Sequence, residues 1–142
     1  MGLFLIAQIA GRTVAIDSAA VESVVDIGTI VPVPRAERHI RGLAALRSRV
    51  VTVIDTRAAL GLEPGTSEAA RAVITIVDGH HYAVLVDALD DVAPFDLAPL
   101  AAGIRLDKGW CQIGRGVVER EGEPILAIAL DTLVPGTAQL AA

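Results

Sequence analysis

FLIAQIAGRTVAIDSAAVESVVD, residues 4–26, occurs a second time in altered form as VITIVDGHHYAVLVDALDDVAPFD, residues 73–96. Residues 5–26 align with residues 73–94 without a gap at a constant offset of 68, which places Gly11 on Gly79. Each copy predicts a strand, a glycine turn, a second strand, a short connection and a third strand, because glycine adopts the backbone angles that tight hairpin turns need. The chain is therefore expected to contain a duplicated, strand-rich unit.

The residues that close each unit repeat more loosely. RVVTVIDTRAAL, residues 49–60, resembles EPILAIALDTLV, residues 123–134, because an apolar strand runs into Asp-Thr in both. This likeness matches Asp55 with Asp131. The side chain of Asp55 is also suited to cap a short helix over residues 56–60, because aspartate accepts hydrogen bonds from the first free N–H groups of a helix.

The segment GLEPGTSEAA, residues 61–70, is rich in turn-forming residues and is predicted to be the joint between the two units. Short strands at regular spacing favour an all-β barrel or sandwich over an α/β fold. Two small barrels side by side would share an apolar interface and leave a groove between them. We expect one internally duplicated domain over residues 1–142, a length that fits a single domain.

The composition supports a core made of aliphatic side chains, because hydrophobic residues make up 53% of the chain and aromatic residues only 3%. The single cysteine, Cys111, excludes an internal disulfide and fits a reducing compartment. The apolar start has no basic residues before it and is broken by Gln8 and Gly11. We therefore predict a first strand there rather than a signal peptide or a membrane span, and a cytoplasmic protein without membrane insertion.

The charges are unevenly distributed along the chain. Residues 35–57 hold six of the twelve basic residues against only two acidic ones, in a chain of net charge −5. Arginine contacts carboxylates through two hydrogen bonds and is frequent in protein interfaces, so this window predicts a docking site for a protein partner. The alternative is a set of solvated or weakly ion-paired side chains. An acidic balance with one lysine argues against a nucleic-acid partner.

No set of residues in the sequence has the spacing of a catalytic or metal site. His80 and His81 are neighbours, which would point to opposite faces of a strand, and Cys111 lacks a second cysteine nearby. The glycines of IGRGVVE, residues 113–119, lack the third glycine of a dinucleotide-binding loop. The aspartates at strand ends suit turns and caps. We therefore expect no enzyme, no metal site and no cofactor.

Two stretches of the first half show a family likeness. FLIAQIAGRTVAIDSAAVESVV, residues 4–25, followed by IVPVPRAERHIRGLAALRSRVVTVIDTRAALGL, residues 30–62, resembles the CheW-like domain of bacterial chemotaxis coupling proteins. The likeness rests on an Ile-Asp hairpin end, a proline step, a Gly-x-x-x-Leu-Arg motif and an apolar strand ending in Ile-Asp. YAVLVDALDDV, residues 82–92, extends the likeness into the second half, and Ser23 stands where the family usually has glutamate.

The resemblance implies an all-β fold of two SH3-like five-stranded β-barrels around a shared hydrophobic core. It also implies a non-catalytic adaptor that binds the regulatory domain of a CheA-type histidine kinase and the helical tip of methyl-accepting chemoreceptors, recruited to receptor arrays at the inner membrane. The alternative is a CheW-like scaffold module in a signalling complex unrelated to motility. The receptor-binding candidates implied by the family motif are Val21, Gly42 and Arg47, and those added by proximity are Arg41 and Arg49.

Overall fold

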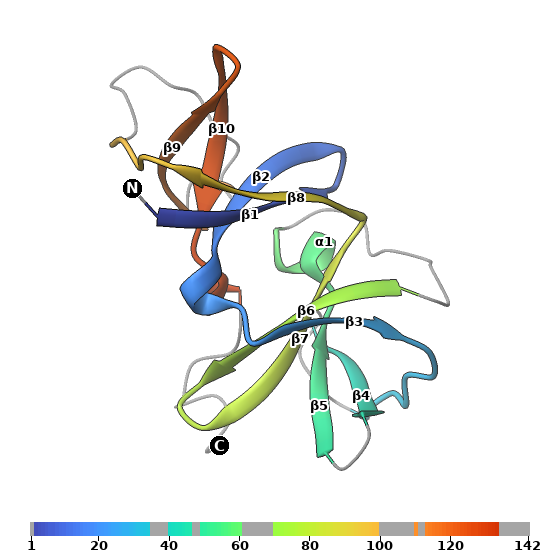
Figure 1. The fold of residues 1–142 in the computed structure, drawn as a ribbon. Helices are drawn as coiled ribbons and strands as arrows, with labels where there is room; N and C mark the ends of the chain where they lie inside the picture. The colour runs from blue at the N-terminus through green and yellow to red at the C-terminus, as the bar shows by residue number, and fades with distance from the viewer. Residues whose placement is uncertain are drawn as a thin grey trace.

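The computed structural model describes residues 2–34, 40–46, 49–60, 70–99, 110 and 113–133. These residues form ten strands, one short α-helix and two 3₁₀ turns (Figure 1). The expected all-β fold is confirmed. The strands are β1 Gly2–Ile9, β2 Arg12–Asp17, β3 Ser23–Ile27, β4 Ile40–Leu46, β5 Arg49–Ile54, β6 Ala70–Val77, β7 His80–Val86, β8 Ala88–Phe95, β9 Gly114–Arg120 and β10 Glu123–Ile128, and the helical turns are η1 Ser18–Ala20, α1 Thr56–Ala59 and η2 Leu130–Thr132.

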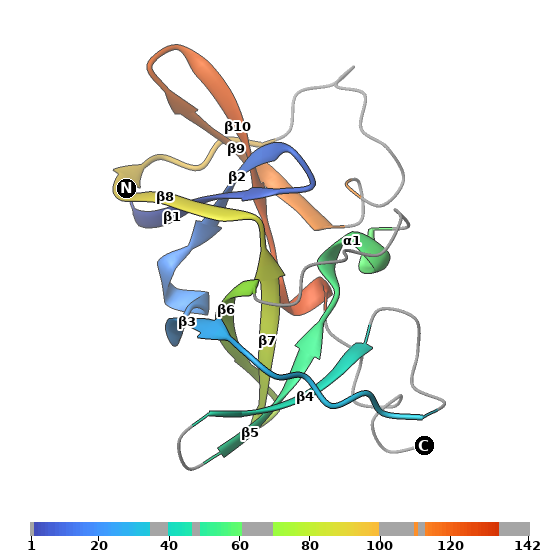
Figure 2. The same ribbon diagram turned by 90° about the vertical axis from the view of Figure 1, so that its right-hand side faces the viewer.

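The strands form two five-stranded sheets, each curled into a barrel. The first has the order β8-β1-β2-β10-β9 and the second the order β3-β6-β7-β5-β4. The two barrels lie one above the other in both views, with α1 between them (Figures 1 and 2). The equivalent strands of the duplication occupy equivalent places, so the two-barrel fold expected from the sequence repeat is present.

The hairpin of each half is inserted into the barrel of the other half. The β1–β2 hairpin pairs with β8 on one side and, in parallel, with β10 on the other. The β6–β7 hairpin in turn pairs with β3 and, in parallel, with β5. Each barrel is therefore built from strands of both sequence halves, and neither half contains a complete sheet.

The strand register corrects one match made from the sequence. Ala127 pairs with Ala15 in the first barrel, and Val53 pairs with Ala83 in the second. Since Ala15 and Ala83 are equivalent in the repeat, Val53 corresponds to Ala127. Asp55 then corresponds to Ala129, two residues before Asp131, so the match between the two aspartates was wrong. The Asp-Thr pair of the second half lies inside η2 instead of preceding it.

The predicted glycine turns are confirmed. Gly11 and Gly79 have φ values of 81° and 80°, and the non-glycine residue before each also has a positive φ. Two successive positive φ values define the type I′ turn, whose twist matches that of a two-residue β-hairpin. The predicted helix is also present as α1, with Asp55 accepting a 3.1 Å hydrogen bond from the Ala58 N–H. The proposed joint over residues 61–70 lies outside the described residues except for the backbone of Ala70.

The largest group of buried apolar side chains lies between the barrels and not inside either one. Barrel interiors form two smaller clusters, one around Ile6 and Ala127 and one around Val53 and Ala83. Side chains from both sheets meet in the middle cluster, which also takes up Trp110. Its members are Leu5, Ala7, Ile9, Val14, Ile16, Leu60, Val73, Val84, Val86, Trp110, Ile113, Leu126, Ile128, Leu130 and Leu133.

This shared core joins the two barrels, because burial of apolar area is the main favourable term in folding. In the described part of the chain, no helix is long and apolar enough to span a bilayer.

Tyr82 is the largest fully buried side chain, and its hydroxyl group has no hydrogen-bond partner. Burial raises the pKa of Tyr82 above its ordinary value of 10.0, and the Asp78 carboxylate raises it further. We expect Tyr82→Phe to increase the free energy of unfolding by about 1 kcal/mol, because an unsatisfied buried hydroxyl is removed. Urea unfolding at neutral pH measures this difference.

The pH dependence of the same variant provides a second check. In the unfolded chain the tyrosine ionises near pH 10.0, whereas in the folded protein it stays neutral to a higher pH. Wild-type stability should therefore fall as pH rises above 10, and Tyr82→Phe should lose less over that interval. Parallel loss in the two proteins would contradict the burial of a neutral phenol.

Candidate functional site

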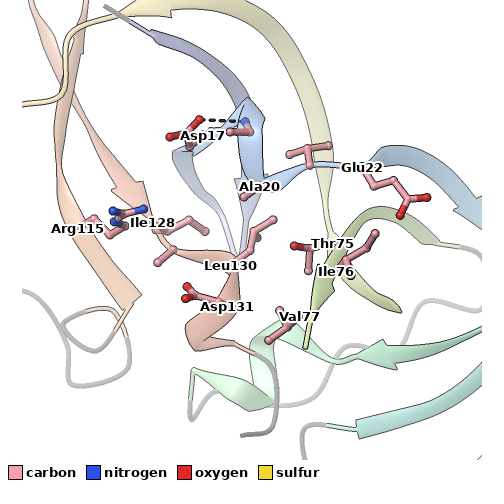
Figure 3. Close-up of a pocket in the computed structure, with 13 residues that line it drawn as sticks. Asp17, Ala20, Glu22, Thr75, Ile76, Val77, Arg115, Ile128, Leu130 and Asp131 are labelled. Carbon is pink, nitrogen blue, oxygen red and sulfur yellow. Dashed lines mark hydrogen bonds between the residues drawn. The ribbon is translucent and has the colours of Figure 1, made fainter. Parts of the chain in front are cut away.

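A groove of about 500 Å³ lies where the two barrels meet (Figure 3). We call it the inter-barrel groove. One wall comes from the segment around η1, a second from β6, and a third from the start of β9 and the turn η2. Its lining residues are Asp17, Ala19, Ala20, Val21, Glu22, Thr75, Ile76, Val77, Arg115, Ile128, Ala129, Leu130 and Asp131.

Short backbone and side-chain hydrogen bonds fix the corner that carries Val21. Asp17 ends β2 and accepts a 3.0 Å bond from the Ala19 N–H, which starts η1. The N–H of Val21 then closes η1 on the Ser18 carbonyl at 3.1 Å. The next N–H, of Glu22, donates to the Ile74 carbonyl at 2.7 Å and so joins the corner to β6. Val21 is thereby held at the groove, half-buried against the shared core.

The groove has an apolar floor and a charged rim. Ile128 and Leu130 are buried at its base, whereas Ile76 leaves 50% of its surface exposed. Figure 3 shows Arg115 and Glu22 at opposite ends of this floor. An amphipathic segment of a partner fits such a surface, since apolar contacts supply affinity while rim charges set orientation and association rate.

Arg49 lies at the edge of the same region. Its Nη1 donates to Glu22 Oε1 at 3.1 Å and contacts His81 Nε2, while the other carboxylate oxygen of Glu22 lies 3.2 Å from that ring nitrogen. The three side chains connect the starts of β3, β5 and β7. Because Arg49 is nearly half exposed, its ion pair contributes little to stability, about 0 to 1 kcal/mol. Glu22 supplies the carboxylate of these contacts, and it directly precedes Ser23, which stands where the family usually has glutamate.

Arg41 is engaged inside the second barrel. Its Nη2 lies 2.6 Å from Asp55 Oδ2, and the two side chains expose only 19% and 5% of their surface. Asp55 is at the same time the cap of α1. The structure thus gives Arg41 a bracing role between β4 and α1.

Gly42 is buried on β4 beneath the segment that follows β3. Its φ of 152° disfavours other residues, and a Cβ built on it would lie 2.2 Å from the Val31 carbonyl oxygen. The same approach occurs in the other barrel, where a Cβ on Gly116 would lie 2.3 Å from the Ala98 carbonyl oxygen. Because both barrels need this approach, we assign Gly42 a role in chain packing.

The five candidates named from the sequence do not form one cluster. Val21 lines the inter-barrel groove, and Arg49 reaches its rim through Glu22. Arg41 and Gly42 make internal contacts, and Arg47 lies outside the described residues. The sequence reasoning missed Ile76, Arg115 and Leu130, because nothing in a local pattern indicates that β6, β9 and η2 meet at one groove.

A comparison with known protein families identifies the domain. The model of the CheW-like domain matches residues 3–137. The chain belongs to the CheW-like domain family. CheW-like domains are non-catalytic scaffold modules, and the expected family and fold are confirmed.

One similar solved structure is the scaffolding protein TtCheW from Thermoanaerobacter tengcongensis. It has a TM-score of 0.76 and 23% sequence identity, over 90% of this chain and 88% of that one. At this identity the likeness concerns the fold of the CheW-like domain. The comparison with curated proteins gave no match.

Proposed function

We propose that this CheW-like protein is an adaptor that couples the cytoplasmic tips of chemoreceptors to a CheA-type histidine kinase in bacterial chemotaxis. The observation that carries the proposal is the presence of two separate apolar surfaces on one domain with a shared core. An adaptor without catalysis needs to hold two partners at once, and it needs a rigid body between them. In this role the protein acts in the cytoplasm, at receptor arrays on the inner membrane.

The first surface is the inter-barrel groove, proposed as the receptor site. A receptor tip is a helical hairpin, and a helix docks by laying its apolar stripe into a groove. Val21 and Ile76 offer accessible aliphatic surface there. Arg49 holds Glu22 at the rim. Arg47, two residues earlier in the sequence, remains the candidate for a contact with a receptor carboxylate.

The second surface is an exposed apolar area on the outer side of the second barrel. Val31 pairs with Leu43 through two backbone hydrogen bonds, and Ala45 pairs directly with Val50, so each pair lies on one face of the sheet. Val31 and Val50 expose 61% and 62% of their surface and Leu43 exposes 37%. We call Val31, Leu43, Ala45 and Val50 the β4–β5 face. It shares no residue with the inter-barrel groove.

We propose that the β4–β5 face binds the regulatory domain of the kinase. Contiguous exposed apolar residues mark interaction sites in proteins of this size. The regulatory domain of a CheA-type kinase is itself expected to have the CheW-like fold, so two β-barrels would pack side by side through such faces.

Introducing one charged side chain into each surface by substitution tests the proposal. Ile76→Glu is expected to weaken binding of a receptor-tip peptide at least about tenfold, which corresponds to 1.4 kcal/mol, and to leave kinase-domain binding unchanged. Val50→Glu should do the opposite. Titration calorimetry of each variant against both partners measures the effects, and thermal unfolding confirms that both variants remain folded.

The two variants act as controls for each other, because each introduces the same glutamate at a residue that is at least half exposed. Loss of both partners in either variant would mean that the two surfaces are not separate. Unchanged binding of both partners in both variants would refute the proposed sites.

A further inference from the structure

The second sheet curls round until its two edges approach, but these edges do not pair along their length. β3 and β4 stand at opposite ends of the strand order. The segment after β3 joins β4 through the backbone pairing of Val31 with Leu43. At the other end Glu22, just before β3, is ion-paired with Arg49 at the start of β5. Between these two closures lies a groove of about 620 Å³. We call it the seam groove.

The lining residues show that the seam groove lies beside the edge of β3 and not over one of its faces. Four consecutive residues of this strand, Ser23 to Asp26, border it. Consecutive side chains of a strand point to opposite faces, so a cavity in contact with all four must lie along the strand edge. The opposite wall is formed by Ala45, Leu46 and Arg49 at the tip of the β4–β5 hairpin. β6 occupies the other edge of β3, and among the described residues no strand pairs with this one.

The chemistry of the seam groove suits an uncharged apolar segment. Val25 and Leu46 are half-buried there and Ile74 is buried at its base. The charged residues at its borders are already paired within the protein: Glu22 with Arg49, and Asp26 with Arg71 at 3.2 Å. A charged ligand would therefore find no unpaired charge on these residues, whereas an apolar one would find aliphatic walls.

The equivalent edge in the other barrel is composed differently. β8 carries Asp90 and Asp91 together with Pro94, the residues that commonly protect a sheet edge from further pairing. β3 has the sequence SVVDI, without proline and with two adjacent valines. Apart from Asp26, the edge of β3 thus lacks the protecting residues that its repeat has.

We propose that the seam groove binds an extended, uncharged apolar segment of a partner protein, which adds to β3 as a further strand and fills the gap between the two edges. Strand addition of this kind supplies affinity through main-chain hydrogen bonds and specificity through alternate side chains. Inward side chains of the segment would contact Val25, Leu46 and Ile74. The site shares only Glu22 with the inter-barrel groove and only Ala45 with the β4–β5 face, and it does not depend on the proposed adaptor role.

The probe is the peptide acetyl-Thr-Val-Ser-Val-Thr-Val-amide, titrated into ¹⁵N-labelled protein. We expect amide chemical-shift changes confined to Ser23–Ile27 and to Ala45 and Leu46, with a Kd of about 1 mM or tighter. The control is the same peptide with alternate backbone amides methylated, which removes the donors needed for strand pairing while keeping the side chains. It should give no shifts at this edge.

A matched pair of variants locates the site. Ala45→Trp places a large side chain in the seam groove and should abolish binding. Val50→Trp places the same side chain on the directly paired residue outside the groove and should change affinity less than about twofold. The proposal would be overturned by equal binding of both peptides or by retained binding in Ala45→Trp. It would also be overturned if the wild type showed no shifts at millimolar peptide, or shifts centred on other residues. Far-UV circular dichroism verifies that both variants are folded.

Discussion

Gly42→Ala is expected to lower the free energy of unfolding by about 3 kcal/mol or more, a loss at the upper end of single substitutions. The added Cβ would lie 2.2 Å from the Val31 carbonyl oxygen and 2.8 Å from its carbon, and both atoms belong to backbone. A backbone neighbour cannot rotate away as the end of a side chain can. The φ of 152° adds strain to any residue with a Cβ. Relief of this clash requires the Val31–Leu43 backbone pairing to open. That pairing also closes one end of the seam groove.

Gly28→Ala is the matched control, because no atom of the described residues, apart from its chain neighbours, lies within 4 Å of the Cβ it would add. Urea unfolding, followed by the fluorescence of the single tryptophan, Trp110, compares the two variants. Equal stability of Gly42→Ala and Gly28→Ala would contradict the close approach. Receptor-tip binding, measured on the same variants, tests the role of Gly42 that the family motif implied. Loss of binding in a Gly42 variant of unchanged stability would support a direct contact. Loss of both binding and stability would support a role in packing.

Asp55→Ala is expected to cost about 4 kcal/mol of unfolding free energy, the sum of a helix cap and the lower limit for a buried ion pair, because Arg41 keeps 19% of its side chain exposed. The change removes two interactions of one buried side chain: the cap on α1 and the 2.6 Å ion pair with Arg41. Loss of a helix cap costs about 1 kcal/mol, and removal of one partner from a buried ion pair costs about 3 to 5 kcal/mol because the other charge stays buried. Thermal and urea unfolding measure the loss.

Two further variants separate these contributions. Asp55→Asn keeps a cap acceptor and removes the charge, so it should retain part of the stability. Asp131→Ala removes the exposed aspartate that the sequence matched with Asp55, and it should change stability by less than about 0.5 kcal/mol. If Asp131→Ala were as costly as Asp55→Ala, the equivalence of Asp55 with Ala129 in the repeat would be contradicted.

The hairpins and the duplication could be predicted from the sequence because they depend on neighbouring residues. Alternating aliphatic residues around Gly11 and Gly79 determine a strand, a turn and a strand, whatever the rest of the chain does. The exchange of hairpins could not be predicted, because strand patterns do not specify which distant strand completes a sheet. The correspondence between the later strands of the two units was also hard to predict, because their connections differ in length. Twelve residues separate β3 from β4, but 18 separate β8 from β9. This difference shifts the later strands of the two units by six residues relative to the hairpins.

The candidate site was predictable only where a residue is fixed by its own segment. Val21 follows η1 directly, so the corner that presents it is local, and the structure places it at the inter-barrel groove. The arginine-rich window gave the charges but not their partners. Arg41 is turned inward to Asp55 while Arg49 contacts Glu22 at the surface, and a count of charges cannot distinguish these two outcomes. Ile76 and Leu130 meet only through the tertiary fold.

The insertion of each hairpin into the opposite barrel gives this single chain the connectivity of a domain-swapped dimer whose two subunits have been fused. A chain cut within residues 61–69 would yield one fragment with β1 to β5 and another with β6 to β10, and each would lack the strands that lie at the centre of its own sheet. The fragments would therefore be expected to fold only on association, as a complementing pair. In the intact chain, the local concentration of each hairpin near the opposite barrel is set by its covalent connection, so both barrels should unfold in one transition.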